Sequence, residues 1–283
     1  MKKMNQICDL HTHSCFSDGS YTPEELIDAA IGAGIAAIAM TDHNTADGLP
    51  HFMAAAQGKD IDVVPGVEFS VDYEGRELHL LGLFIKPVYF SQIAVLMREF
   101  RERKERSNLE LIDALARVGV VLDYDAIKKA AAGYVNRLHI ATAMEEKGYV
   151  SSRSEAFDGL LSPGAGLYKE PKRVTLCEML DIIHSIGAVS VLAHPFFKWD
   201  EPSVAQLLPR AKAAGLVGME CYYSTYDEPT TQAALHLAKE NGLLPSGGSD
   251  FHGAGKPDIS LGVGRGNLQI PYAWYEALRE KAM

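Results

Sequence analysis

Histidine and carboxylate residues recur at short spacings along this chain, and they are the residues best suited to chemistry. They occur in three close pairs and as three single residues: His11 with His13, Asp42 with His43, Asp250 with His252, and Glu68, His79 and His194. In an extended segment, side chains two residues apart point the same way, so His11 and His13 can bind one ion together. Imidazole and carboxylate groups suit zinc, iron and manganese. The pattern therefore predicts a divalent-metal site.

Most of these residues coincide with the ends of expected strands. Short apolar and β-branched runs alternate with helix-like stretches, which is typical of a largely parallel sheet. We expect seven strands, at residues 7–11, 35–40, 62–67, 78–85, 188–192, 216–220 and 244–249. In an α/β barrel the carboxyl ends of the strands meet at the active-site face. That fold would gather the strand-end residues into one pocket, whereas His79 stands at the start of its strand.

Residues 88–166 differ from the rest of the chain. Charged, helix-like sequence dominates there, for example across 97–106, and glycines such as Gly119 and Gly148 interrupt it. We interpret this stretch as a helical insertion that could act as a lid and limit substrate size. The sequence thus predicts an α/β barrel formed by 1–87 and 167–283, with the insertion at 88–166.

Composition restricts the class of protein. The 283 residues include 47% hydrophobic and 23% charged residues, as expected for a globular protein with a substantial core. No apolar run reaches the roughly 18 residues of a membrane span, no signal-peptide core follows the first residues, and the four cysteines are scattered. We therefore expect a cytoplasmic protein without disulfides or membrane contact. The net charge of -10 disfavours a long nucleic acid as partner but allows a small phosphorylated substrate at bound metals.

Five short segments, in this order, resemble the PHP (polymerase and histidinol phosphatase) family. They are Asp9-Leu10-His11-Thr12-His13, Thr41-Asp42-His43-Asn44, Pro65-Gly66-Val67-Glu68, Leu192-Ala193-His194-Pro195 and Gly247-Gly248-Ser249-Asp250-Phe251-His252-Gly253. The resemblance implies a distorted seven-stranded (β/α) barrel. It also implies two or three divalent metal ions, for which manganese, iron and zinc remain alternatives.

The resemblance also implies how the ligands are shared. The first metal would take His11, His13, Glu68 and Asp250; the second would share Glu68 and add His79 and His194; the third would use Asp18, His43 and His252. Many family members have His where this chain has Asp18, whereas a stand-alone nucleotide-phosphatase branch has Asp there. Asp makes that third position richer in oxygen and leaves its metal open.

The predicted insertion resembles the same branch at residues 136–141. Arg137 and His139 stand at the start of a helix, and Arg grips phosphate with two parallel hydrogen bonds. We predict that both bind substrate, and Lys169 is a weaker candidate of the same kind. A solvent-facing helix start is the alternative interpretation.

These features together predict a metal-dependent phosphoesterase. We expect Glu68 to be shared by two metals, and His194 or Asp250 to carry the proton. Arg137 would stabilise the phosphoryl oxygens. The branch implies the 3′-phosphate of nucleoside 3′,5′-bisphosphates, or short 5′-phosphorylated oligonucleotides, as substrates.

Other functions remain as alternatives. A histidinol phosphatase is the first, and a non-catalytic metal-binding PHP module is the second. An amidohydrolase-like barrel also begins with His-x-His, but the early His43, Glu68 and His79 argue against it. The sequence leaves the oligomeric state open.

Overall fold

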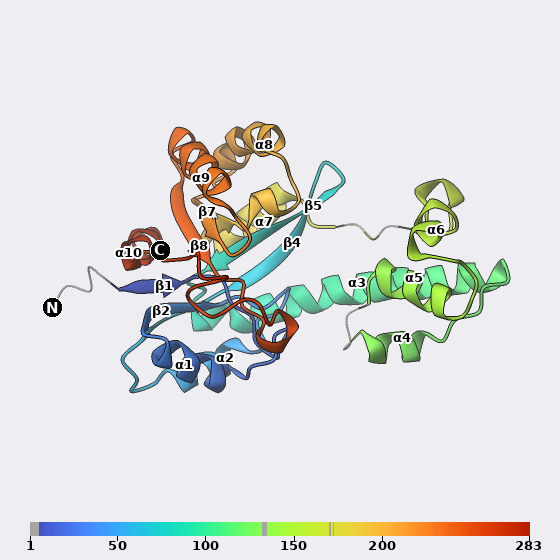
Figure 1. The fold of residues 1–283 in the computed structure, drawn as a ribbon, viewed down its shortest axis with the longest axis horizontal. Coiled ribbons are helices and arrows are strands. Elements are labelled where there is room, and N and C mark those ends of the chain that lie inside the picture. Colours follow the sequence, from blue (N-terminus) through green and yellow to red (C-terminus); the bar gives the residue numbers. More distant parts are fainter. Residues whose placement is uncertain (1–5, 132–134, 170, 172) are drawn as a thin grey trace. The chain divides into compact units, whose positions relative to one another are not determined.

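The computed structural model describes residues 6–131, 135–169, 171 and 173–283 and has a mixed α/β architecture (Figure 1). The chain divides into two compact units: Met1–Met97 with Val174–Met283, which we call the sheet unit, and Arg98–Arg173, which we call the helical unit. Our predicted insertion spanned 88–166. The helical unit begins later in the chain because helix α3 (Phe90–Arg117) continues without a break through the boundary.

The strands of the sheet unit form two sheets. The first is parallel, in the order β1 (Ile7–Asp9), β2 (Ile35–Met40) and β3 (Asp62–Pro65). The second has the order β4 (Val67–Tyr73), β5 (Arg76–Leu83), β6 (Val189–Leu192), β7 (Gly218–Tyr223) and β8 (Leu244–Gly248). The described residues therefore form eight strands, where the sequence predicted seven.

Strand β5 runs antiparallel to both of its neighbours, β4 and β6. A two-residue turn at Glu74 and Gly75 joins it to β4, and both residues have positive φ angles, 53° and 80°. This is the geometry of a tight hairpin, for which Asn-Gly or Asp-Gly is the usual sequence signal. Glu-Gly gives a weaker signal, which is why β4 was not predicted as a separate strand.

The two sheets meet at their edges without merging into one. Isolated bridges pair His43 with Glu68 and Thr12 with Phe251, and Leu10 N donates to Gly247 O at 3.1 Å. Among the described residues these contacts do not complete a closed barrel. The structure thus bears out an α/β fold, and the seven-stranded barrel stays an interpretation.

Helices cover the outer faces of the sheets (Figure 1). In the sheet unit these are α1 (Pro23–Gly32), α2 (Leu49–Ala55), α7 (Leu176–Ser185), α8 (Glu201–Ala213), α9 (Glu228–Glu240) and α10 (Tyr272–Arg279). Thr22 and Thr175 cap α1 and α7 in reciprocal capping boxes with Glu25 and Glu178. After α3, the helical unit consists of α4 (Tyr124–Ala130), α5 (Arg137–Glu146) and α6 (Arg153–Asp158), which surround their own apolar core.

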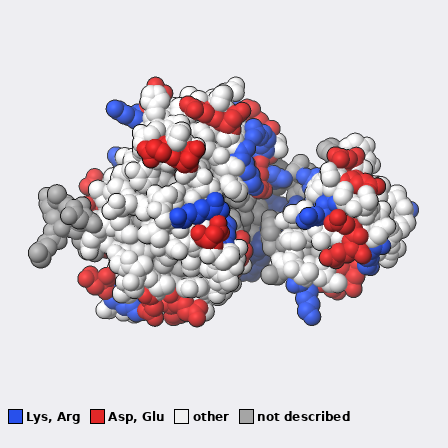
Figure 2. Space-filling model, in the orientation of Figure 1, with Lys and Arg blue, Asp and Glu red and all other residues white. Residues whose placement is uncertain are grey.

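The surface carries charges of both signs. On the face drawn in Figure 2, small groups of Lys and Arg lie beside Asp and Glu and form no continuous basic stripe among the described residues. No described helix is both long enough and apolar enough to cross a membrane.

One fully buried carboxylate, Asp9, connects the first strand to the chain after β8. Its Oδ1 accepts a hydrogen bond from Ser249 N at 2.9 Å, and its Oδ2 accepts from Ser249 Oγ at 2.6 Å and from Gly262 N at 2.8 Å. Buried donors of this kind need an acceptor, because water cannot replace it. Asp9 therefore holds together the two segments that carry His11 and Asp250.

We expect Asp9→Ala to lower the free energy of unfolding by about 2–4 kcal/mol, because the buried donors of Ser249 and Gly262 lose their acceptor. Urea denaturation measures this change. Asp28→Ala is the control, because that carboxylate lies on the surface in an ion pair with Lys59 and its removal should change stability little. Equal stability of the two variants would contradict the role given to Asp9.

Candidate metal centre

Glu68, the second residue of β4, is fully buried at the centre of a group of imidazoles. Its Oε1 lies 2.7 Å from His79 Nδ1 and 2.9 Å from His194 Nε2. Its Oε2 lies 3.0 Å from His11 Nε2 and 3.1 Å from both His13 Nε2 and His43 Nδ1. Five imidazoles thus surround one carboxylate, and they come from segments as far apart in sequence as 11 and 194.

Asp250 completes a first cluster of donors with His11, His13 and Glu68. Its Oδ1 lies 3.2 Å from His13 Nε2 and 3.6 Å from His11 Nε2. One ligand atom from each of the four residues lies within 4.8 Å of the others. These are the residues that the sequence assigned to the first metal.

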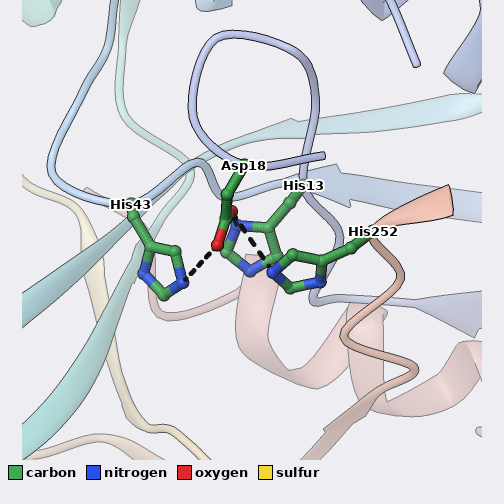
Figure 3. Close-up of side chains that lie close together, drawn as sticks. All are labelled: His13, Asp18, His43 and His252. Atoms are coloured by element: carbon green, nitrogen blue, oxygen red, sulfur yellow. Dashed lines mark ion pairs between the residues drawn. The ribbon is translucent and has the colours of Figure 1, made fainter. Parts of the chain in front are cut away.

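A second cluster forms around Asp18, in the loop after β1 (Figure 3). Asp18 Oδ1 lies 3.2 Å from His252 Nε2 and 3.7 Å from His13 Nδ1, and Asp18 Oδ2 lies 3.7 Å from His43 Nε2. Figure 3 shows the four side chains facing one another. The sequence grouped Asp18 with His43 and His252; the structure adds His13.

A third cluster consists of His43, Glu68 and His79, with His194 Nε2 close to the same Glu68 oxygen. The sequence had placed His79 and His194 with Glu68, without His43. The antiparallel direction of β5 explains how His79 reaches the site. The His79 backbone oxygen accepts a hydrogen bond from Ala193 N at 3.0 Å. His79 therefore lies level with the carboxyl end of β6, where His194 follows.

Two of these residues have strained backbones. His194 has a φ angle of 27° and Asp250 one of 55°, both in the left-handed region that residues other than glycine rarely adopt. Such strain persists only where surrounding contacts hold it, and it is common at functional sites.

The ionisation of the group depends on burial and on Glu68. Burial alone would raise the pKa of Glu68, but the surrounding imidazoles lower it well below its usual value. Burial would lower the pKa of His79, but the Glu68 carboxylate raises it to about 9. Burial lowers the pKa of His43 to about 3 despite the nearby charge of Glu68, so that ring is neutral and its lone pair is available.

The imidazole nitrogens and carboxylate oxygens of the clusters are better arranged to bind divalent metals than to form hydrogen bonds with one another. His11 Nε2 and His13 Nε2 lie only 3.1 Å apart, although at most one proton can lie between them. The buried His13 Nδ1 has no hydrogen-bond partner within the described part of the chain. Imidazole nitrogens and carboxylate oxygens together form the ligand set of zinc, iron and manganese. The three clusters are therefore suited to hold such ions.

Comparison with known proteins identifies the family. A model of the PHP domain matches residues 9–169. The chain belongs to the PHP family. It is 32% identical over 250 residues to a 5′-3′ exoribonuclease of Haemophilus influenzae, which covers 88% of this chain and 91% of the relative. It is 30% identical over 258 residues to a 3′,5′-nucleoside bisphosphate phosphatase of Chromobacterium violaceum, covering 90% of each.

A solved structure agrees with this relationship. A predicted metal-dependent phosphoesterase from Bifidobacterium adolescentis superposes with a TM-score of 0.72 at 25% identity, covering 98% of this chain and 97% of the other. The PHP protein is thus a metal-dependent hydrolase that acts on phosphate esters.

Further carboxylates of the PHP site hold its imidazoles in place. Fully buried Glu220 places Oε1 3.0 Å from His11 Nδ1, and its Oε2 accepts from His194 N at 2.7 Å. The first contact turns His11 Nε2 toward Glu68. Such contacts to the remote ring nitrogen set the orientation of metal-binding histidines.

Asp42 has a similar role for the loop that carries Asp18. It accepts hydrogen bonds from Ser14 N at 2.7 Å, Ser14 Oγ at 2.6 Å and Ser17 Oγ at 2.6 Å. The sequence analysis grouped Asp42 with His43 as a residue suited to chemistry. In the structure the Asp42 carboxylate is hydrogen-bonded to this loop.

Two residues at Asp250 were missed by the sequence analysis. Tyr223 Oη and Lys256 Nζ both donate to Asp250 Oδ2, at 2.8 and 2.6 Å, so Oδ1 is left to face the histidines. A β-bulge between Glu220 and Tyr222 brings Tyr223 to the same side of β7 as Glu220. Strand alternation alone would have placed them on opposite sides.

The predicted substrate-binding residues belong to the helical unit. The Arg137 guanidinium lies 4.5 Å from the centre of the Tyr168 ring. His139 Nδ1 accepts a hydrogen bond from Asn136 N at 3.2 Å and so takes part in the capping box of α5. The Lys169 side chain is 82% exposed. Their role in substrate binding stays a prediction.

We expect Glu68→Gln to lose metal from every cluster that Glu68 serves, because a neutral amide cannot balance the cations. Metal content after purification, measured by inductively coupled plasma mass spectrometry, tests this. Glu74→Gln, on the exposed hairpin turn, is the matched control. A full metal complement in Glu68→Gln would rule out the shared-carboxylate arrangement.

We expect Glu220→Gln to weaken metal affinity about 10- to 100-fold, because one of its two donors then faces an amide NH₂ group. Competition with a chromogenic chelator gives the dissociation constant, and circular dichroism reports the fold. Glu240→Gln, on the surface of α9, should bind metal as the unmodified protein does. An unchanged affinity in Glu220→Gln would show that the His11 ring needs no such support.

Proposed function

We propose that this PHP phosphoesterase removes the 3′-phosphate from nucleoside 3′,5′-bisphosphates and also trims short 5′-phosphorylated oligonucleotides. The observation that carries the proposal is the cluster of five imidazoles around Glu68, joined to the Asp18 cluster through His13. This number of donors exceeds what a single ion requires. The names of the two relatives, which share most of their length with this chain, support nucleotides as the substrate class.

A pocket with a volume of about 160 Å³ lies directly beside the clusters, and Asp18, His43 and His194 form part of its lining. Two lysines contribute to the lining of this pocket. The Lys198 side chain is 58% exposed and the Lys256 side chain is 35% exposed. Their charges favour an anionic ester group in a chain whose net charge is -10.

Two or three ions of manganese, iron or zinc, bound by the three clusters, would neutralise the charge that develops on the phosphoryl oxygens. Glu68 keeps the imidazoles close to one another. Burial alone would raise the pKa of Asp250, but His11 and His13 lower it well below its usual value. Asp250 therefore stays charged, which suits a ligand better than a proton carrier. His194, which also lines the pocket, is the better candidate to carry the proton.

Arg137 and Lys169 are our proposed phosphate contacts in the helical unit, and the lid role of that unit is part of the same proposal. The Tyr168 ring beside Arg137 limits the freedom of its guanidinium group, which lowers the entropy lost when it grips a phosphate. His139 uses Nδ1 to cap α5, so that only Nε2 is left for a substrate.

Phosphate release tests the proposal. Purified protein with added manganese should release phosphate from adenosine 3′,5′-bisphosphate and shorten a 5′-phosphorylated oligonucleotide, and chelation should abolish both reactions because the clusters then lack their ions. Asp18→Ala should lose most of the rate, whereas Asp28→Ala should not.

Histidinol phosphate is the comparison substrate. Turnover of histidinol phosphate alone would reject the nucleotide proposal but keep the phosphoesterase class. Metal-loaded protein that hydrolyses none of the three would reject the proposed substrates and favour a metal-binding module.

A further inference from the structure

A half-exposed aromatic side chain, Phe197, stands at the pocket beside the metal clusters. It ends the short 3₁₀ turn Pro195–Phe197 and is 52% exposed, whereas Pro195 in the same turn is buried. Phe197 N donates to His194 O at 2.9 Å, so the turn follows directly from His194. Exposing this much of an apolar ring is unfavourable in water. A ligand that covers the exposed ring would recover this free energy.

Neighbouring rings fix the orientation of Phe197. Its ring centre lies 5.8 Å from that of His194 and 6.1 Å from that of Tyr223, and both pairs meet edge to face. Such pairs are favourable and restrict rotation. A held ring loses little freedom when a ligand stacks on it, which is an advantage for binding.

The two other large aromatic residues that line the pocket, Trp199 and Tyr223, are buried. The Arg76 guanidinium lies 3.6 Å from the centre of the Trp199 ring, and Trp199 is only 8% exposed. Arg76 Nη2 also donates to Lys198 O at 3.3 Å, which keeps the guanidinium there. Lys198 Nζ lies 5.9 Å from the centre of the Phe197 ring, much farther than Arg76 lies from Trp199. Of the Phe, Trp and Tyr residues that line this pocket, Phe197 therefore has the most exposed surface.

Position suggests what stacks on Phe197. Its ring contacts the His194 ring, and His194 Nε2 lies 2.9 Å from Glu68 Oε1. Phe197 is thus one side chain away from the donors that would hold a reacting phosphate. A planar, uncharged group joined to that phosphate through a sugar would reach the exposed ring. Nucleobases are such groups, and every base offers a flat π face.

We propose that Phe197 is a stacking platform for the nucleobase of the substrate and sets the preference of this site for nucleosides over base-free phosphate esters. This inference rests on the proposed nucleotide phosphatase function. Stacking tolerates any base, so the platform selects nucleosides without selecting one base.

The test compares adenosine 3′,5′-bisphosphate with ribose 3,5-bisphosphate, which lacks the base. The measured quantity is the ratio of kcat/KM for the two substrates, in which general damage to the site cancels. Phe197→Ala should lower this ratio about ten-fold or more, as expected for loss of one base–aromatic contact. Phe197→Leu should also lower it, and Phe197→Trp should preserve it. Ile31→Ala, an exposed apolar residue on α1, is the control.

An unchanged ratio in Phe197→Ala and Phe197→Leu would overturn the platform while leaving the phosphatase function intact. Dissociation constants for adenosine 5′-monophosphate and ribose 5-phosphate, measured by calorimetry on metal-loaded protein, separate the two proposals further. If the protein hydrolyses neither bisphosphate, the proposed function fails. The platform then holds if Phe197→Ala removes the preference for the nucleotide in binding, and it fails if the preference persists.

Discussion

Glu68 places a negative charge at a fully buried position, and much of the sheet unit is arranged to balance that charge. Moving a carboxylate from water into a protein interior costs several kcal/mol unless cations or hydrogen bonds compensate it. Five imidazole rings from four different segments provide this compensation. The same rings offer lone pairs to cations, so a buried charge that would destabilise a fold without ligands is suited to be the common ligand of our proposed metal centre.

Three further buried carboxylates hold together the segments that carry the histidines around Glu68. Asp9 joins β1 to the chain beyond β8, Asp42 holds the loop of Asp18, and Glu220 fixes His11 and the backbone of His194. Each accepts hydrogen bonds from backbone or hydroxyl donors of a different strand end. Because two sheets supply the site, such connections replace the continuous hydrogen bonding that a closed barrel would provide.

Much of the metal centre could be predicted from the sequence, because the donors stand at short fixed spacings beside strands. His11 and His13 follow from strand alternation, and Glu68 from its place after a β-branched run. The arrangement around Tyr223 could not be predicted, because a β-bulge inverts the expected alternation and leaves no local signal. Lys256 follows His252 in a loop, where no periodicity constrains the direction of a side chain.

The fold was predicted less completely, for a related reason. The hairpin turn with Glu74 in a left-handed conformation lacks the Asn-Gly or Asp-Gly sequence that usually predicts such a turn. The sequence analysis therefore missed that β4 and β5 form an antiparallel hairpin. His79 was nevertheless assigned to the site, through resemblance to the family. In the structure His79 lies within β5, and its position at the site is explained by the antiparallel direction of that strand.

If the histidines and carboxylates of the clusters bind cations as we propose, substrate recognition falls to residues outside the ligand set. That leaves the segments that follow the strands. The turn after His194 carries Phe197 and Lys198, and the loop after His252 carries Lys256. Both are short and lie at the pocket, so they can change without disturbing the buried donors. A phosphoesterase built in this way can keep one hydrolytic centre while different loops select different phosphate esters, which fits the differing activities of its relatives.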